Sequence, residues 1–279
     1  MLTLDKIKKR AETDKVSTSL VFKEHVHLII LEYLFKKGLF SQMVFQGGTA
    51  LRLVYHGVRY SEDLDFVLQN KGLPCFENMY AELQPLTSQI KKLIPFVTTA
   101  HLKVQKETPS FRRYSLALEA DFLNAKDKTN IEIANIPSHK YQTIIIRHPD
   151  VSLSPAINVE IPEEILSDKL LAFCARDYIK GRDLWDIYFI MHTLNVSINK
   201  EIIDMVGNKI SDYGLTKNEV LTRLNKRIEM LTSDGVRLLH EEMDRFLPSS
   251  YRETFKDRYP DICNDELNVF ITLLKELKT

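Results

Sequence analysis

One stretch of 23 residues, QGGTALRLVYHGVRYSEDLDFVL from Gln46 to Leu68, constrains the fold more than any other part of the chain. A short apolar run at 43–45 precedes two adjacent glycines, and apolar residues then recur at helical spacing. That order predicts a strand, a turn and a helix. Gly47 and Gly48 can adopt backbone angles that side chains forbid, and they leave bare N–H groups at a helix N-terminus, where an anion is favoured.

An acidic strand is predicted after the helix ends at Gly57. Side chains alternate between the faces of a strand, so Asp63 and Asp65 project together while Leu64 and Phe66 enter the core. Two such carboxylates repel each other unless a cation neutralises them, and Mg²⁺ bound to carboxylates and substrate phosphates suits that role. A solvated strand end would also explain a lone pair of aspartates, but the glycine turn upstream favours the metal site.

The pattern GG[TS]-x-L followed by R-x-S-x-D-[LI]-D-F resembles the first motif of AbiEii-type nucleotidyltransferase toxins, a branch of the DNA polymerase β-like nucleotidyltransferase superfamily. The match runs from Gly47 to Phe66. The resemblance implies metal-dependent transfer of a nucleoside monophosphate from a nucleoside triphosphate. The expected phosphate contacts in this stretch are Gly47, Gly48, Thr49, Arg59 and Ser61.

A second informative stretch, 162–190, is predicted to form two helices that are separated at Gly181. Lys169 and Arg176 lie seven residues apart and share a face of the first helix, and Asp183 and Asp186 lie on the second. A salt-bridged helical hairpin would explain these charges by itself. Asp186 is expected to be structural and to pack against a neighbouring arginine, Arg182 or Arg176.

This second stretch also resembles the toxin family, because K-L-x-A-x-x-x-R followed by R-D-L-x-D-[IL] is similar to its second signature. The two motifs occur in the family's order, which is much harder to meet by chance than one motif. By that resemblance Lys169 contacts the triphosphate, where an ammonium can follow the charge on the transferring phosphoryl group. Asp183 then belongs to the active site and either orients Lys169 or accepts a proton.

A third carboxylate is expected beside the aspartate pair, because two-metal phosphoryl transfer needs acids to hold the ions and to take the acceptor's proton. Four strand-like runs follow the first motif, at 101–106, 114–120, 129–134 and 142–146. Glu132 is the candidate, as a possible further metal ligand on the polar face of the third run. Glu119 and Asp121 are alternatives.

The remaining patterns predict an α+β fold with a mixed sheet and flanking helices, followed by a helical domain. Further helices are expected at 18–37, 74–93, 200–207, 216–231, 235–246 and 265–277, with a connector at 148–160. We expect a nucleotidyltransferase-like domain at 1–155 and a helical domain at 156–279 that completes the active-site cleft.

Composition limits the partners. The 279 residues contain 38 Lys plus Arg and 38 Asp plus Glu, so overall basicity does not drive nucleic-acid binding, and an RNA contact needs a local patch. Arg223, Lys226 and Arg227 share a helix face that could bind phosphates or be merely solvated. Three scattered cysteines, no signal-peptide pattern and no membrane-spanning run predict a cytoplasmic protein without a membrane partner.

Together these features predict a Mg²⁺-dependent nucleotidyltransferase toxin. Its acceptor is expected to be RNA such as a tRNA 3′ end, within a type IV toxin–antitoxin system that acts in phage defence and encodes an antitoxin nearby. Two alternatives stay open. One is a catalytically silent scaffold of the same fold that binds RNA or a partner protein, and the other is a metal-dependent nuclease that uses Asp63, Asp65 and Glu132.

Overall fold

The computed structural model describes residues 3–122, 126–148, 154–176 and 178–278, and it divides the chain into two compact units. The first unit spans Met1–Val159 and the second spans Glu160–Thr279. The sequence-based boundary lies between residues 155 and 156. Each unit is built around its own apolar core.

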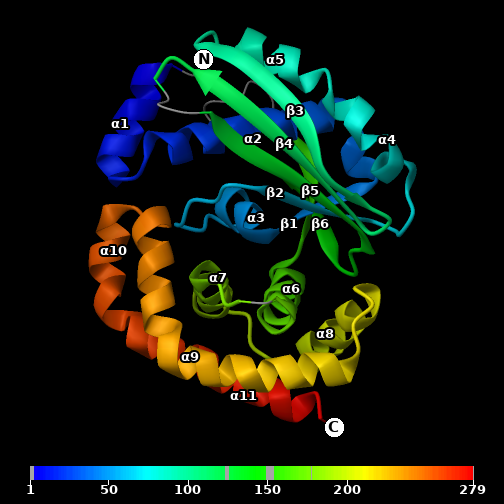
Figure 1. Cartoon of the computed structure of the whole chain (residues 1–279), viewed down its shortest axis with the longest axis vertical. Helices are drawn as coiled ribbons and strands as arrows, with labels where there is room; N and C mark the ends of the chain where they lie inside the picture. Colours follow the sequence, from blue (N-terminus) through cyan, green and yellow to red (C-terminus); the bar gives the residue numbers. More distant parts are fainter. Residues whose placement is uncertain (1–2, 123–125, 149–153, 177, 279) are drawn as a thin grey trace. The chain divides into compact units, whose positions relative to one another are not determined.

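A seven-stranded mixed sheet with the strand order β3-β4-β5-β2-β1-β7-β6 organises the first unit (Figure 1). Two neighbouring pairs, β2 with β5 and β1 with β7, are parallel. The strands are β1 (Met43–Gln46), β2 (Leu64–Leu68), β3 (Val97–Thr108), β4 (Phe111–Ala120), β5 (Asp127–Pro137), β6 (Tyr141–Ile145) and β7 (Ala156–Glu160). The helical segments are α1 (Leu4–Asp14), α2 (Thr18–Lys36), η1 (Leu39–Ser41), α3 (Gly47–Leu53), α4 (Pro74–Leu83) and α5 (Leu86–Leu93).

The two faces of this sheet differ in character because of strict side-chain alternation. On β2 and β5, Leu64, Phe66, Ile131 and Ile133 are each at most 1% exposed. Helices α2, α4 and α5 pack on this side, where for example Tyr80 of α4 stacks on Tyr114 of β4. The opposite face carries the acids, and beside them a separate apolar cluster of Val44, Val67, Ala134 and Ile136. The sequence pattern therefore places the acids away from the main core.

Helices alone form the second unit: α6 (Pro162–Ala175), α7 (Gly181–His192), α8 (Lys200–Asp212), α9 (Lys217–Phe246), α10 (Ser249–Phe255), η2 (Lys256–Arg258) and α11 (Tyr259–Glu276). The long helix α9 begins with a capping box between Thr216 and Glu219, and α6, α7 and α11 pack along it (Figure 1). Phe173 of α6 stacks on Phe270 of α11 with ring centroids 3.6 Å apart. A shared apolar core therefore joins the first and last helices of the unit.

Three local predictions were wrong. The helix predicted at 74–93 is two helices, since Pro85 lacks a backbone N–H and interrupts the hydrogen bonding. The predicted connector at 148–160 contains β7, which pairs with β1, and its residues 149–153 lie outside the described part. The segments 216–231 and 235–246 form one helix, because Gly235 provides close packing against Cys263 instead of a break.

In the part of the chain that the structure describes, no helix combines the length and the apolar character needed to cross a bilayer.

Candidate active site

The glycine pair makes a tight turn in which side chains would be strained or crowded. Gly47 has φ +78°, a conformation that other residues rarely adopt, and it begins α3 directly after β1. A Cβ atom added to Gly47 would lie 2.6 Å from Oδ2 of Asp65, and one added to Gly48 would collide with the guanidinium of Arg59. The turn therefore lets the backbone approach Asp65 closely on one side and Arg59 on the other.

Asp63 and Asp65 are directed to one face of the sheet by different neighbours. Asp63 lies just before β2, and its Oδ1 accepts a hydrogen bond of 3.0 Å from the side-chain amide of Asn130. Asp65 lies within β2 and is the register partner of Glu132 on β5. Since Asn130 and Glu132 alternate to the same face of β5, the two half-buried aspartates share that face.

Glu132 lies next to the pair and is neutralised by an arginine. Its carboxylate forms an ion pair of 2.7 Å with Nε of Arg113, the facing residue on β4. Burial would lower the pKa of Arg113, but the hydrogen bond to Glu132 and the charges of Asp63 and Asp65 outweigh it and raise that pKa. The structure therefore places a cation beside all three carboxylates. The alternative Glu119 pairs with Lys126 and Thr99, six residues from Arg113 along β4.

The loop that precedes Asp63 is fixed from behind by α2. Lys23 bridges Glu62 and Asp127 at 2.9 and 3.1 Å, and Nε2 of His27 bonds the carbonyl of Glu62 at 3.0 Å. Burial lowers the pKa of His27 to about 4, so the ring is neutral at pH 7 and must carry its proton on Nε2 to donate to that carbonyl. No catalytic role was predicted for His27, and the structure places it in support of the acidic loop.

The residues that the resemblance assigns to phosphate contacts differ in accessibility. Thr49 is fully buried, and its hydroxyl donates to the carbonyl of Asp63, so it ties α3 to the acidic loop. Arg59 is 4% exposed, packs under Gly48 and donates to the carbonyl of Tyr60. Ser61 remains partly exposed beside Gly48. Among these three side chains, Ser61 is the accessible one, whereas Thr49 and Arg59 hold the turn in place.

In the second unit, the predicted lysine and acids form one ion-pair cluster. Nζ of Lys169 lies 2.9 Å from Asp183 and 2.7 Å from Asp186, and Arg176 also pairs with Asp183. Burial would raise the pKa of Asp183, but Lys169 and Arg176 outweigh it and hold that pKa well below its ordinary value. Asp186 contacts Lys169, a partner that was not predicted for it, and both aspartates orient the ammonium group.

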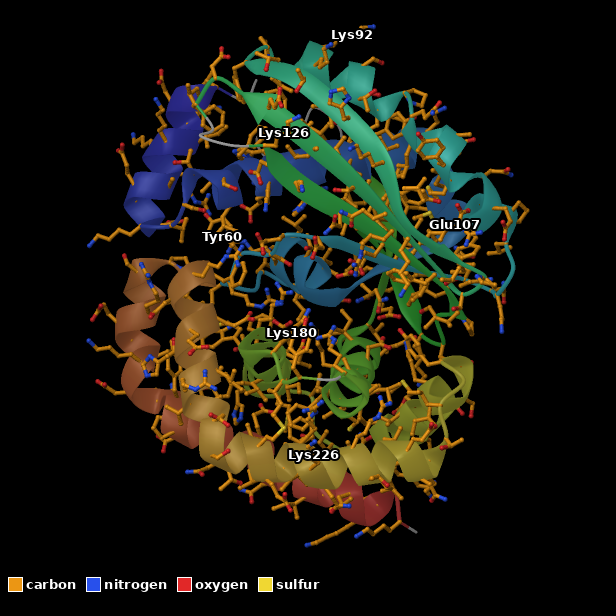
Figure 2. All side chains as sticks on the ribbon, viewed as in Figure 1. Tyr60, Lys92, Glu107, Lys126, Lys180 and Lys226 are labelled. Atoms are coloured by element: carbon orange, nitrogen blue, oxygen red, sulfur yellow. The ribbon has the colours of Figure 1, made fainter. Side chains whose placement is uncertain are left out.

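Further cations surround this cluster. Lys180 immediately precedes α7, and burial together with the charges of Arg182, Arg176 and Lys169 lowers its pKa. Gly181 follows it, and a Cβ there would collide with the carbonyl of Leu238, so α7 packs directly on the α9 backbone. The helical unit therefore presents a local excess of positive charge near Lys169, with Lys180 labelled in Figure 2.

The arginines predicted as alternative RNA contacts on α9 are used inside the helical unit. Arg223 donates to the carbonyl of Ala175, and Arg227 donates to the carbonyl of Arg176. These are carbonyl groups at the C-terminal end of α6, where a helix leaves acceptors unsatisfied. Arg227 is buried, whereas Arg223 and Lys226 remain exposed, with Lys226 labelled in Figure 2.

A different acidic cluster has the tightest geometry among the described residues. Glu160, Glu164 and Asp168 offer oxygen atoms that lie within 4.8 Å of one another. Nζ of Lys209 occupies the centre, at 3.3, 2.7 and 2.7 Å from the three carboxylates, and its side chain is fully buried. The lysine already supplies the cation, so this cluster is a structural ion-pair network.

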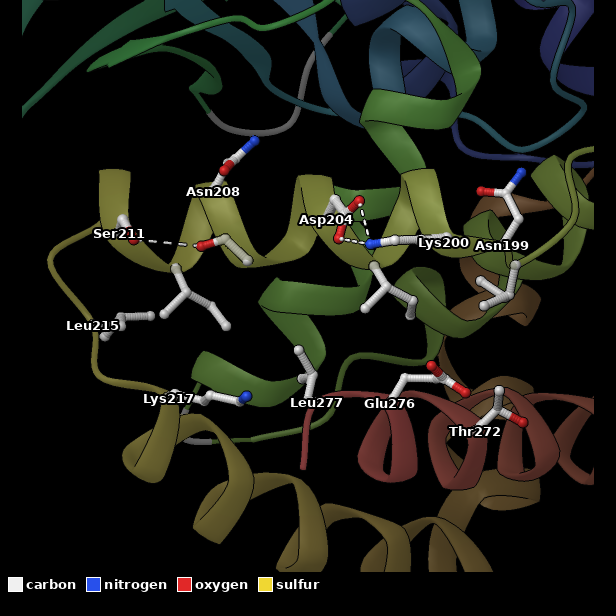
Figure 3. Close-up of a pocket in the computed structure, with 14 residues that line it drawn as sticks. Asn199, Lys200, Asp204, Asn208, Ser211, Leu215, Lys217, Thr272, Glu276 and Leu277 are labelled. Carbon is white, nitrogen blue, oxygen red and sulfur yellow. Dashed lines mark hydrogen bonds and ion pairs between the residues drawn. The ribbon is translucent and has the colours of Figure 1, made fainter. Parts of the chain in front are cut away.

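A hollow of about 1000 Å³ lies between α8 and α11 and contains no residue that the sequence motifs predict (Figure 3). Its charged lining includes the internal pair of Lys200 with Asp204, 3.1 Å apart. We assign it no part in the chemistry.

Three residues were not predicted from the sequence. Asn130 and Arg113 contact the acids of the first unit, and Lys180 lies near the Lys169 cluster of the second. Asn130 and Arg113 contact the acids only because β4, β5 and β2 are adjacent and in register. The alternation within the predicted strand at 129–134 did place Asn130 on the face of Glu132, and this was the one available signal. Lys180 adjoins the second motif without belonging to it.

A mixed sheet with carboxylates beside a glycine turn, followed by a helical unit, defines the class of nucleotidyltransferase-like proteins. Two solved structures share this fold. A proposed nucleotidyltransferase from H. pylori is 21% identical with a TM-score of 0.55, and the match covers 94% of this chain and 98% of that one. JHP933 from Helicobacter pylori is 20% identical with a TM-score of 0.52, and the match covers 94% and 95%.

The family model "Nucleotidyl transferase AbiEii toxin, Type IV TA system" matches residues 29–262. The chain belongs to this family, and it is therefore a nucleotidyltransferase and a toxin of a type IV toxin–antitoxin system. The comparison with curated proteins found no match. The predicted family, the enzyme class and the α+β fold with a C-terminal helical region are thereby confirmed.

Proposed function

We propose that the protein transfers a nucleoside monophosphate from a Mg²⁺-bound nucleoside triphosphate to an acceptor RNA. One observation carries the proposal: Asp63, Asp65 and Glu132 face the same side of the sheet next to the tight turn of Gly47 and Gly48. In the transfer, an acceptor hydroxyl oxygen forms a bond to the α-phosphorus. The bond between the α-phosphorus and the oxygen that bridges it to the β-phosphorus breaks, and pyrophosphate leaves with that electron pair.

The carboxylates suit a divalent cation by their chemistry. They offer hard oxygen ligands, they are partly accessible, and Arg113 already supplies a compensating positive charge beside them. Asp63 and Asp65 would hold Mg²⁺, and Glu132 would join them where Arg113 releases it. When bound, the ion would withdraw charge from the phosphates and bring the triphosphate next to the acids.

The chain's own groups divide the remaining work in this proposal. The backbone N–H groups of Gly47 and Gly48, with the hydroxyl of Ser61, bind phosphate oxygens, while Thr49 and Arg59 fix the turn. One of the carboxylates of Asp63, Asp65 and Glu132 accepts the proton of the attacking hydroxyl. Lys169 binds the triphosphate as a cation, and Asp183 positions it.

The biological part of the proposal follows from the family. We propose that the RNA acceptor is of the type of a tRNA 3′ end, and that the reaction takes place in the cytoplasm, where triphosphates and tRNA occur together. The transfer would arrest growth as part of phage defence. A nearby gene for a transcription-regulating antitoxin would provide the partner of the type IV system.

The decisive test is incubation of the purified protein with total RNA, Mg²⁺ and each of the four α-labelled nucleoside triphosphates in turn. Matched reactions contain EDTA or lack the triphosphate. Label on RNA that depends on both Mg²⁺ and one triphosphate supports the proposal. Cleavage of RNA without a triphosphate would establish a nuclease, and no label on any RNA would favour a silent binding scaffold.

A further inference from the structure

The face of the sheet that bears the acids continues beyond them as an ordered grid. Because strands β5, β4 and β3 pair in register, residues of the same face line up in rows across them. The three rows are Glu132, Arg113 and Lys106, then Asn130, Ser115 and Lys103, and then Lys128, Ala117 and His101. Asp65 extends the first row onto β2, and Asp63 contacts Asn130 in the second.

The charges on this grid are arranged by strand. On β3, every row ends in a nitrogen-bearing side chain, and His101, Lys103 and Lys106 are all exposed. On β4, the middle residues Ser115 and Ala117 are short; Ser115 is buried and Ala117 is half-buried, so the charged groups of these rows lie on the flanking strands β3 and β5. Lys106 also lies 5.5 Å from the ring centroid of Phe111. We name the exposed side chains of His101, Lys103, Lys106 and Lys128 the basic strip.

The spacing of the cations in the basic strip allows an extended, negatively charged polymer to contact several of them at once. Neighbouring strands are about 4.8 Å apart, so Lys106 lies roughly 14 Å across the sheet from Asp65, and alternate residues along β3 are about 6.6 Å apart. Among the described residues, neither Lys103 nor Lys128 has a carboxylate within ion-pair distance. These cations are therefore available for an external anion.

We propose that the basic strip binds the phosphate backbone of the acceptor RNA, so that the strand lies over β4 with its reactive end toward Asp63 and Asp65. Phosphate contacts from lysines give affinity without base specificity, and a row of them positions a strand in register. A protein with zero net charge needs such a local patch to bind nucleic acid. The inference rests on the proposed function, because it assigns the surface that presents the acceptor.

An acidic protein segment is the competing occupant for a basic surface. One feature favours RNA. The strip continues up to the acids across the paired strands, so the end of a bound strand would lie where the transfer would occur.

The test uses the full chain and a fluorescent single-stranded RNA of mixed sequence, with binding followed by anisotropy at several salt concentrations. K103E/K106E is expected to weaken binding at low salt by more than tenfold and to reduce the slope of log affinity against log salt by about 2. K103Q/K106Q should weaken it less, and circular dichroism monitors the fold of both. The control K91E/K92E makes the same charge change on α5, where both lysines are exposed and Lys92 points outward in Figure 2.

Unchanged RNA binding by K103E/K106E would overturn the proposal, as would an equal loss in K91E/K92E. Competition provides a second measurement: poly-glutamate that displaces RNA from the wild-type protein at equal charge concentration would assign the strip to acidic proteins and overturn the RNA assignment. Binding of a fluorescent nucleoside triphosphate with Mg²⁺ to the wild type is measured separately. Its failure removes the proposed function, whereas intact nucleotide binding with insensitive RNA binding removes only the basic strip.

Discussion

Two carboxylate clusters of this protein differ in burial and in the cation that compensates their charge. Glu160, Glu164 and Asp168 lie closest together, but they are buried around Lys209. Burial and the charge of Asp168 raise the pKa of Glu160 well above its ordinary value, and the three carboxylates share the cation of Lys209. Asp63, Asp65 and Glu132 are more open, and the arginine beside them is 39% exposed.

The comparison teaches that close approach of acids is a poor guide to a metal site. A buried lysine cannot leave, because its ammonium group would lose its partners and face an apolar interior. A partly exposed arginine can exchange its carboxylate for water or phosphate at little cost. Accessibility and the mobility of the compensating charge therefore distinguish the proposed catalytic acids from the structural ones.

The largest expected effect is a loss of nucleotidyl transfer when the open cluster of Asp63, Asp65 and Glu132 is altered. Asp65→Asn keeps the size of the side chain but removes a charge that the proposed chemistry needs, so nucleotidyl transfer should fall about a thousandfold. The measurement is the initial rate of label transfer to RNA, with the thermal midpoint showing that the fold persists. The matched variant Glu164→Gln alters the buried cluster and should retain the activity of the folded fraction. If it instead abolished transfer while Asp65→Asn did not, the assignment of the two clusters would be reversed.

The second prediction concerns the buried cluster. Lys209→Met removes the buried cation that all three carboxylates share, and the free energy of unfolding should fall by about 3–5 kcal/mol. Urea denaturation followed by circular dichroism measures this change. Lys200→Met is the control, because Lys200 pairs with Asp204 on the surface at 87% exposure and should change stability by less than about 0.5 kcal/mol. Equal effects of the two variants would contradict the structural role of Lys209.

The third prediction concerns the pH dependence of stability that arises from His27, which holds the loop preceding Asp63. The pKa of His27 is about 4 in the folded protein and higher in the unfolded chain, so the unfolded chain takes up the proton first as the pH falls. The stability contribution is complete above pH 6.5 and is lost between about pH 6.5 and 4, with a total of about 3 kcal/mol. Unfolding free energies of wild type and His27→Gln across this range measure it. A pH slope that is the same in both proteins would rule out His27 as the source.

The smallest expected effect concerns the arginine beside the open acids. Arg113→Gln removes the positive charge that competes with a metal ion for Glu132, and the apparent affinity for Mg²⁺ should rise about fivefold. Calorimetric titration with Mg²⁺ alone checks this. Lys126→Gln is the control, since it removes a cation that pairs with Glu119 farther along the same strand. Weaker Mg²⁺ binding in Arg113→Gln would show that the arginine helps to build the site instead of competing for it.

The sequence could predict the parts of this architecture that depend on local pattern. Adjacent glycines, the D-x-D alternation and the two helices around Gly181 are local features, and all appear in the structure. Strand pairing is not local, so neither the strand order nor the contact of Arg113 with Glu132 could be derived. β7 was missed because turn-forming residues precede its five residues, and Pro85 was overlooked inside an otherwise helical pattern.

The parallel pairing of β2 with β5 has a consequence for how the enzyme comes into being. The hydrogen bond from Asn130 to Asp63 joins residues 67 positions apart, and the β3–β4 hairpin lies between them in the chain. Contacts of such long range form late, because the entropy of closing the loop must be offset before they stabilise the fold. A growing polypeptide therefore carries the glycine turn and both aspartates long before its acids can assemble, and toxicity is expected to begin only when folding of the sheet is complete.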